Sequence, residues 1–236
     1  MAASVVQSKK AFFSGAPSGS LTLDSNVTAG NTIVVLISDY GAVPSENFSC
    51  QDDHSNTYTL KVSRATQSGS IFTSIFYAYN VNTTGSYTVG VLDSSEAASI
   101  SFTVAELTGV PTTDNSDGSN SNAGTGTAVD SGSLTPTVTG DVLIAVMSSY
   151  AGTTVTINPD ADYTQLQEYE NGATEVHHNV EVRIYDSTSP DTANWTIGSS
   201  LRWCGCIAAF KKSVPASTPS LAMSTINRKF GHLFAR

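Results

Sequence analysis

Short apolar runs, separated by turn-forming residues, follow one another along most of the chain. The runs are rich in Val, Ile, Thr, Tyr and Phe, and clusters of Gly, Asn, Asp, Ser or Pro divide them, which is typical of antiparallel strands. In SISFTV at 99–104, apolar and hydroxyl side chains alternate, which predicts one core face and one solvent face. TIVVLI at 32–37 and VLIAVM at 142–147 are continuously apolar and predict central strands covered on both faces. The pattern therefore predicts an all-β protein.

Four segments recur in the same order in the second half of the chain, offset by roughly 105–110 residues. Such ordered recurrence predicts an internal duplication. The paired segments are GNTIVVLI at 30–37 with GDVLIAVM at 140–147, NTYTLKV at 56–62 with ADYTQLQ at 161–167, TSIFYAYN at 73–80 with VEVRIYDS at 180–187, and 87–107 with 194–210.

The duplication predicts two antiparallel β-sandwich lobes, tandem or fused, of the jelly-roll or immunoglobulin-like kind. We expect the first lobe at 1–110 and the second at 127–213. Between them, 111–126 holds almost no large apolar residue and many turn formers, which predicts a flexible linker or long loop. The pattern leaves open whether the lobes are separate or halves of one larger sandwich, and we expect them to pack closely.

The composition changes again in the C-terminal segment 214–236. From Lys211 onward the chain carries five of its eleven Lys and Arg residues and no Asp or Glu. Ile226, Phe230 and Phe234 have the spacing of an apolar stripe on a short helix. We expect an extended basic and apolar tail that docks on a neighbouring subunit, with a frayed terminus as the alternative. The expected docking residues are Ile226, Arg228, Lys229, Phe230, Leu233, Phe234 and Arg236.

Composition and charge exclude several classes of function. The chain has 236 residues, 39% of them hydrophobic, and a net charge of −9, which disfavours a nucleic-acid partner. No stretch reaches the roughly 18 apolar residues of a membrane span, so we expect no membrane insertion. The first twenty residues lack the apolar run of a secretory signal, which predicts assembly in the cytoplasm.

The sequence contains no recognisable catalytic constellation. It has no G-x-S-x-G elbow, no P-loop and no dinucleotide fingerprint, so we expect a protein that is not an enzyme and has no cofactor. Asp52, Asp53 and Asn56 are the metal candidates, since a calcium ion takes such oxygen ligands, but turn capping needs the same residues and is the preferred interpretation.

The positions of the histidines and cysteines likewise do not indicate a metal centre. His177 and His178 are neighbours, so in a strand they point to opposite faces, and we expect them in a surface hairpin. Cys50, Cys204 and Cys206 are too few for a disulfide framework, which predicts buried free thiols. Pairing of Cys50 with one of the other two is the alternative.

Several short segments together resemble a repeat of bacteriophage virion and tail-associated proteins and of bacterial surface proteins. They are TAGNTIVVLIS, QDDHSNTYTL, SIFYAYNV and FTVAELTGV in the first unit, and TGDVLIAVMSS, DADYTQLQE and CIAAFK in the second. The resemblance covers most of 20–212 and implies jelly-roll or immunoglobulin-like β-sandwich modules. This chain departs from the pattern at Tyr163, where such modules often carry Trp. The resemblance transfers no catalytic residue.

Together these features predict a non-enzymatic structural protein of a virus particle, in a head-decoration, fibre or tail-associated role. Its expected partners are other virion structural proteins and further copies of the same chain. The alternative is a carbohydrate-binding or adhesion module of a cell-surface or extracellular protein. In that case Tyr40 and Trp195 are the expected ligand-facing aromatic residues, because aromatic rings form the platforms of sugar sites.

Overall fold

The computed structural model describes residues 2–41, 48–66, 70–83, 85–93, 98–113, 115–169 and 176–214. These ranges form strands and turns without a helix, in agreement with the all-β prediction, and none of their segments is a helix that could cross a membrane. The strands are β1 (Ser4–Ala16), β2 (Ser18–Thr22), β3 (Thr32–Tyr40), β4 (Phe48–Asp52), β5 (Thr59–Ala65), β6 (Ile71–Ala78), β7 (Thr88–Asp93), β8 (Ala98–Thr108), β9 (Ser116–Asp130), β10 (Asp141–Ser149), β11 (Ile157–Asn158), β12 (Thr164–Tyr169), β13 (His177–Tyr185) and β14 (Asn194–Phe210).

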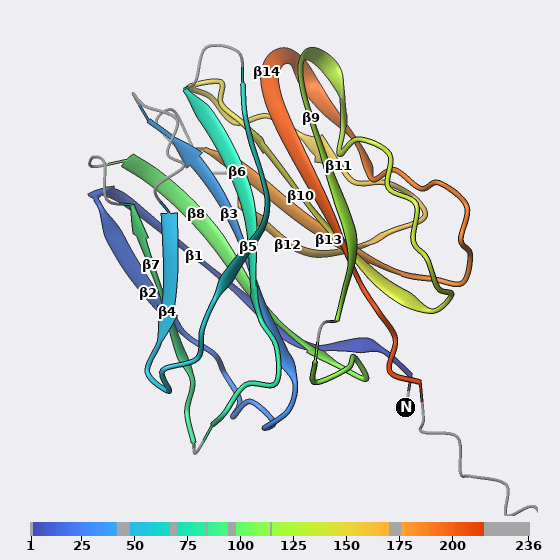
Figure 1. The fold of residues 1–236 in the computed structure, drawn as a ribbon. Coiled ribbons are helices and arrows are strands. Elements are labelled where there is room, and N and C mark those ends of the chain that lie inside the picture. The colour runs from blue at the N-terminus through green and yellow to red at the C-terminus, as the bar shows by residue number, and fades with distance from the viewer. Residues whose placement is uncertain are drawn as a thin grey trace, which may run out of the picture.

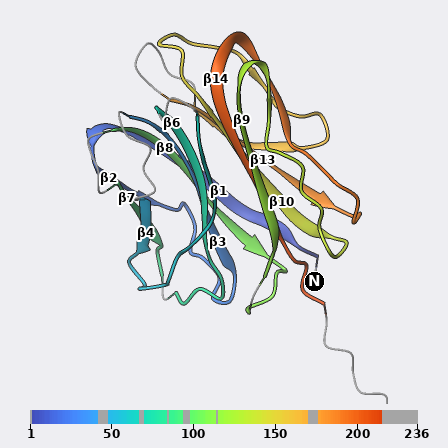
Figure 2. The same cartoon turned by 45° about the horizontal axis from the view of Figure 1, so that its top comes forward.

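The strands form three antiparallel sheets that stack as three layers (Figures 1 and 2). The small sheet has the order β2-β7-β4, and the central sheet has the order β1-β8-β3-β6-β5. The distal sheet has the order β11-β14-β10-β13-β12, with β9 also paired to β14. The central sheet lies between the other two, so both of its faces are covered.

The apolar strand β3 shows why the layers form. Ile33, Val35 and Ile37 pack in the core shared with the small sheet. Val34 and Leu36 point the other way and pack in the core shared with the distal sheet. Because successive side chains of a strand alternate between faces, only a strand buried on both sides needs an unbroken apolar run. The prediction of central strands at 32–37 and 142–147 is therefore confirmed.

The prediction of a solvent face for SISFTV at 99–104 is wrong. Ser101 and Thr103 are fully buried because the distal sheet covers that face of β8. The Thr103 hydroxyl lies 2.8 Å from Nε2 of His178 on β13, so the hydroxyl face meets a polar partner instead of water. A hydroxyl row in a strand indicates hydrogen bonding, which a second sheet can supply as well as solvent.

The predicted loop at 111–126 is also wrong from Ser116 onward, because Ser116–Asp130 forms the strand β9. Its backbone pairs with β14 along the edge of the distal sheet. Small side chains suit this position: a Cβ atom built on Gly205 of β14 would lie 2.7 Å from the backbone oxygen of Asp130 in β9. Composition missed the strand because it is held by backbone hydrogen bonds and close approach, with few apolar side chains.

The central and distal sheets have the same plan. β1-β8-β3-β6-β5 and β9-β14-β10-β13-β12 follow the chain in the same relative order. Each has a register irregularity near the start of its first strand, at Val5/Gln7 in β1 and opposite Ala209/Phe210 in β9. Each has another in its last strand, at Leu60/Val62 in β5 and Gln165/Gln167 in β12. The four recurring segments of the sequence lie at matching places in this plan.

The two halves of the chain form one body, which answers the question that the sequence left open. Sheet packs on sheet face to face, with β1 against β12 and β5 against β9. The shared core contains Leu36 and Ile75 from the first half and Ile144 and Val180 from the second. In this contact, β1 of the first half packs on β12 of the second, and the matching strand β9 of the second half packs on β5 of the first. Two subunits of a dimer with a two-fold axis contact one another in the same reciprocal way.

Candidate functional site

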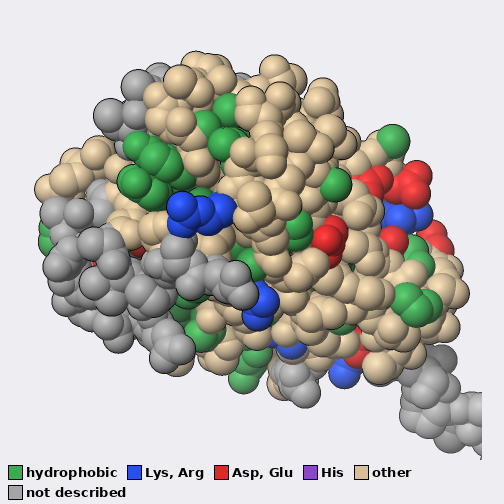
Figure 3. All heavy atoms as spheres, turned by 90° about the horizontal axis from the view of Figure 1, so that it is seen from above, with side chains coloured by type: hydrophobic (Ala, Val, Ile, Leu, Met, Phe, Trp, Pro, Cys, Tyr) green, Lys and Arg blue, Asp and Glu red, His purple; other side chains and the backbone are tan. Residues whose placement is uncertain are grey.

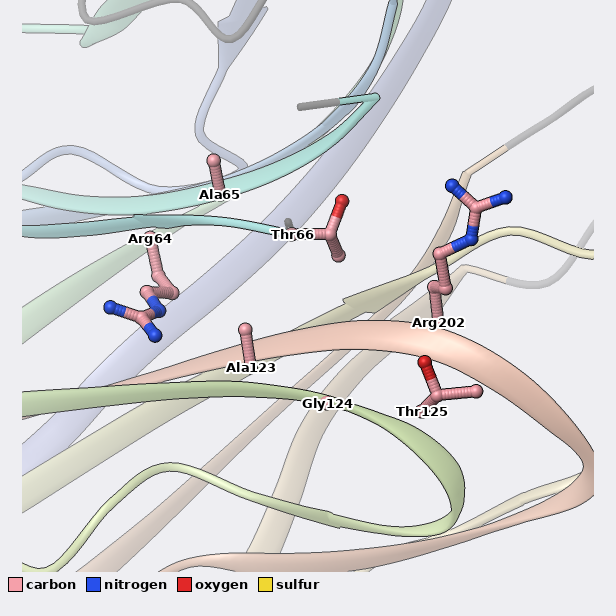
Figure 4. Close-up of a pocket in the computed structure, with 7 residues that line it drawn as sticks. All are labelled: Arg64, Ala65, Thr66, Ala123, Gly124, Thr125 and Arg202. Atoms are coloured by element: carbon pink, nitrogen blue, oxygen red, sulfur yellow. The ribbon is translucent and has the colours of Figure 1, made fainter. Parts of the chain in front are cut away.

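A groove opens between the central and distal sheets, where β5 faces β9 and β14 (Figure 4). Its first part has a volume of about 480 Å³ and its second part about 380 Å³. Thr125 and Arg202 line both parts, so we treat them as one feature, the inter-sheet groove. The first part is also lined by Arg64, Ala65, Thr66, Ala123 and Gly124, and the second by Tyr40, Ser70, Ile71, Tyr150, Ser200 and Leu201.

The groove lies at one end of two rows of neighbouring residues, one row on each of the facing sheets. The side chains at the two ends of this pair of rows differ in size. One row crosses the central sheet in the order Phe12, Ser101, Ser38, Thr73 and Arg64. The other crosses the distal sheet in the order Ala123, Cys204, Ser148, His178 and Tyr169. Because β1 faces β12 and β5 faces β9, the start of each row lies opposite the end of the other.

One end of this pair of rows is closed and the other is open. At the closed end, the rings of Phe12 and Tyr169 stack with centroids 4.7 Å apart. At the open end, the matching positions are held by Ala123 and Arg64, which face one another across the groove (Figure 4). Because Ala123 has a methyl group where the matching position has an aromatic ring, a space between the sheets is left that no side chain of the described residues fills.

The next position of β9 also has a small residue where β1 has an aromatic one: Gly124 matches Phe13. A Cβ atom on Gly124 would lie 2.6 Å from the indole ring of Trp203. The glycine therefore lets the buried Trp203 pack directly under β9. This part of the groove is rigid, since its wall is backbone seated on a core ring.

Two exposed arginines flank the groove from opposite sheets. In Figure 4, Arg64 extends from β5 toward β9, whereas Arg202 extends from β14 toward the β5 side. Arg183, the remaining arginine of the described ranges, is already paired at 3.2 Å with Asp191 and at 3.6 Å with Asp162. Arg64 makes no ion pair with any described residue. The described lining of the groove thus contains two guanidinium groups, on a chain whose net charge is −9.

Tyr40, one of the two predicted ligand-facing aromatic residues, lies in the groove. Its ring stacks on that of Tyr150 with centroids 3.5 Å apart and planes 6° apart. Both tyrosines are half-buried and line the second part of the groove. Tyr40 ends β3, and Tyr150 directly follows β10. The pair therefore comes from the same point in the two matching strands.

The other predicted aromatic residue, Trp195, cannot face a ligand. Its side chain is 2% exposed and packs in the core on the outer face of the distal sheet. Its Nε1 donates a 3.0 Å hydrogen bond to Oδ1 of the buried Asn179. The prediction was wrong because the first part of β14, which pairs with β11 and with the end of β9, contributes Trp195 to this core. The sequence pattern of a single strand does not reveal this packing.

The oxygens of the metal candidates are engaged in a turn. Oδ1 of Asp52 accepts hydrogen bonds from the backbone N–H groups of His54 and Asn56, at 2.9 and 3.0 Å. Oδ2 of Asp52 accepts from the hydroxyl of Tyr87, and Oδ1 of Asp53 accepts from the backbone N–H of Thr88. Such Asx-type bonding holds the chain between β4 and β5. Within the described ranges, three or more His, Cys, Asp or Glu residues nowhere gather as a metal site would need.

The two histidines point to opposite faces as predicted, but the expected surface hairpin is wrong, since both are fully buried in β13. Nδ1 of His178 lies 2.8 Å from the Ser38 hydroxyl, and Nδ1 of His177 lies 3.0 Å from the Ser149 hydroxyl. Burial, followed by the charge of Lys10, lowers the pKa of His178 to about 3. His178 is therefore neutral and works as a hydrogen-bonding element between the sheets.

The cysteines are free thiols, as predicted. Cys204 and Cys206 are buried in β14, and Cys50 is half-buried. Burial raises the pKa of each thiol well above its ordinary value. Thiols in this state are poor nucleophiles, because the reactive form is the thiolate.

Three buried carboxyl groups with raised pKa values, those of Asp39, Asp141 and Glu181, lie outside the described lining of the groove, and burial raises the pKa of Asp141 to about 7. Burial and then the nearby charge of Asp93 raise the pKa of Asp39 to about 7. Burial raises the pKa of Glu181 to about 8, and Oε1 of Glu181 has no hydrogen-bond partner. These groups carry a cost for folding at high pH, since burial disfavours their charged forms.

The seven predicted docking residues of the tail, Ile226 to Arg236, lie outside the described residues. The two arginines of the groove, in contrast, were not predicted from the sequence as functional residues. The available signal was their scarcity: Arg64 and Arg202 are two of only six Lys or Arg residues before Lys211. What could not be read was their proximity, since 138 positions separate them in the chain.

On the face seen from above in Figure 3, the described atoms are mostly backbone and side chains that are neither hydrophobic nor charged, with small separate groups of hydrophobic and charged side chains. Comparison with known proteins adds no further constraint on function. The sequence matches no protein-family model and no curated protein.

Proposed function

We propose that this protein is a non-enzymatic structural protein of a virus particle, built from a duplicated β unit and attached to neighbouring subunits through 214–236. The observation that carries the proposal is the common plan of the central and distal sheets, with the same strand order and irregularities at matching positions. Two copies of one unit packed face to face make a rigid block, which suits an assembly component.

The placement of reactive side chains supports a role without catalysis. His177, His178, Cys204 and Cys206 are all fully buried within β13 and β14. The described part of the groove offers hydroxyl and guanidinium groups but holds no histidine, thiol or carboxylate among its lining residues. A histidine or carboxylate base, which a serine or threonine nucleophile needs for activation, would have to come from outside these lining residues.

The composition of the tail supports attachment. The last strand of the described residues, β14, ends at Phe210, and Val214, the last described residue, is 80% exposed. The tail concentrates positive charge and apolar residues, whereas the body before Lys211 has six Lys and Arg residues against twenty Asp and Glu. A tail of this composition is complementary to the acidic surface of another copy or another acidic subunit.

Mass spectrometry and immunogold labelling of purified particles test the proposal directly. We expect the chain to be a stoichiometric particle component. A version that ends at residue 214 should melt at the same temperature as the full chain but fail to join the particle. Normal incorporation of the truncated chain would refute attachment through the tail, and absence of the chain from particles would refute the structural role.

A second candidate function is adhesion through carbohydrate binding, and the inter-sheet groove favours it. The stacked pair Tyr40 and Tyr150 supplies aromatic surface beside hydroxyl groups, a combination common in sugar sites. A glycan array probed with the full chain and with Tyr40→Ala tests this function. Loss of signal with a Tyr40→Ala variant that is still folded at the assay temperature supports it, and silence across the array refutes it.

A further inference from the structure

We propose that the inter-sheet groove binds a saccharide that carries a carboxylate, such as a uronic acid or a sialic acid. The inference rests on the second of the two proposed functions, adhesion, and names its ligand class. It starts from an asymmetry: matching ends of the paired rows are closed by Phe12 and Tyr169 on one side and left open by Ala123 and Arg64 on the other.

The asymmetry matters because nothing in the shared plan requires it. The same plan closes its other end with a ring stack 4.7 Å between centroids, so an aromatic residue at position 123 would fit the fold. The open end instead has a methyl group, a glycine and a guanidinium group. Loss of core contacts at a rigid position lowers stability unless something else occupies the space.

The charges around the groove indicate an anion. Arg64 and Arg202 approach it from opposite sheets and are both exposed (Figure 4). Among the residues that the structure describes, neither Asp nor Glu lines the groove. The planar guanidinium group matches a carboxylate with two parallel hydrogen bonds, which makes arginine the preferred partner of that group.

The remaining lining indicates a sugar. Thr125, Ser70 and Ser200 present hydroxyl groups, and Tyr40 and Tyr150 present ring surface in the same part of the groove. The hydroxyl groups can donate to and accept from sugar hydroxyls, and a ring face packs on the C–H face of a pyranose. The two parts, about 480 and 380 Å³, have the size of known small-molecule sites, which are about 300–1,000 Å³.

Two other anions fit less well. An acidic peptide is recognised through pockets for alternate side chains or through strand addition, whereas the described lining of the first part of the groove consists of small side chains and the two arginines. A nucleic acid needs several phosphate contacts, whereas this chain offers two arginines on a body of net negative charge.

Titration of the full chain with paired saccharides tests the inference. The probes are tetragalacturonate, a tetrasaccharide that contains glucuronate, and 3′-sialyllactose. Each is compared with a neutral counterpart: the methyl esters for the first two and lactose for the third. We expect at least one acid to bind about tenfold or more tightly than its neutral counterpart, in keeping with a charge-assisted pair of hydrogen bonds.

Variants locate the binding. Arg64→Gln and Arg202→Gln should each weaken the binding of that acid about tenfold, and Ala123→Phe, which restores the ring of the closed end, should abolish it. Lys9→Gln is the matched control, since it removes a positive charge that is paired with Asp24 away from the groove. Equal melting temperatures show that each variant is folded.

The outcomes separate the inference from the function beneath it. Equal affinity for acids and neutral counterparts, lost with Tyr40→Ala, overturns the carboxylate class but leaves adhesion in place. Binding that survives all three groove variants overturns the location. Absence of binding to every saccharide, acidic or neutral, overturns both this inference and adhesion.

Discussion

Tyr40 and Tyr150 stack with their ring centroids 3.5 Å apart, although one ends β3 in the first half of the chain and the other follows β10 in the second. β3 and β10 occupy matching places in the two sheets, and the face-to-face packing of the sheets brings the ends of these strands together. The pair therefore joins the halves at the mouth of the groove.

This stack should couple the two halves energetically. In a double-mutant cycle of Tyr40→Ala and Tyr150→Ala, we expect a coupling of about 0.5–1.5 kcal/mol in the free energy of unfolding, as for other aromatic pairs. Urea denaturation of the four proteins measures it. Strictly additive effects would mean that the rings do not interact in solution.

Trp195→Ala should destabilise the protein far more than Tyr40→Ala. Trp195 is buried in the core and hydrogen-bonded to Asn179, so we expect a loss of about 3–5 kcal/mol. Chemical denaturation checks this value. The contrast also matters for binding assays: loss of sugar binding in Trp195→Ala would reflect unfolding, and a variant with unchanged stability would contradict the core assignment.

Stability should fall as the pH rises from 6.5 to 8.5. The folded-state pKa values of Asp39 and Asp141 are about 7 and that of Glu181 is about 8, above the ordinary values of 3.8 for Asp and 4.5 for Glu. A raised folded pKa contributes stability that is complete below the unfolded pKa and is lost as the pH passes through the folded one. Burial lowers the folded pKa of His178 from 6.5 to about 3, so this residue adds stability as the pH rises through the unfolded pKa and opposes the trend only at the lower end of this range.

Thermal melting against pH tests this dependence. Glu181→Gln should make the fall in stability above pH 6.5 shallower, because it replaces one of the titrating groups with a neutral amide of similar shape, while Asp39 and Asp141 still titrate. Asp24→Asn, at an exposed site, is the control and should leave the slope unchanged. A slope that is the same in all three proteins would show that Glu181 does not titrate as proposed.

Gly205→Ala should weaken the contact between β14 and β9. The added Cβ atom would lie 2.7 Å from the backbone oxygen of Asp130, which cannot move without breaking the ladder. We expect a loss of about 1–3 kcal/mol, measured by denaturation, as for other overpacked sites. Gly85→Ala is the control because its Cβ would meet no atom within 4 Å.

The sequence alone predicted the strands and the apolar core correctly wherever side chains carried the signal. β3 and β10 were predictable as doubly covered strands because a continuous apolar run is costly in any other place. The four recurring segments likewise follow from residue order, and they lie at matching places of the two sheets. These properties depend on local alternation and composition, which a chain carries before it folds.

Only the tertiary structure decided which faces are covered and which residues meet. Ser101 and Thr103 are buried by a sheet whose strands begin after residue 115, and β9 is held by backbone bonds that leave no apolar pattern. Arg64 and Ala123 form the open end of the groove because two sheets pack face to face. The physical reason is that hydrogen bonding and packing between distant segments act through space, whereas a sequence pattern reports only on neighbours along the chain.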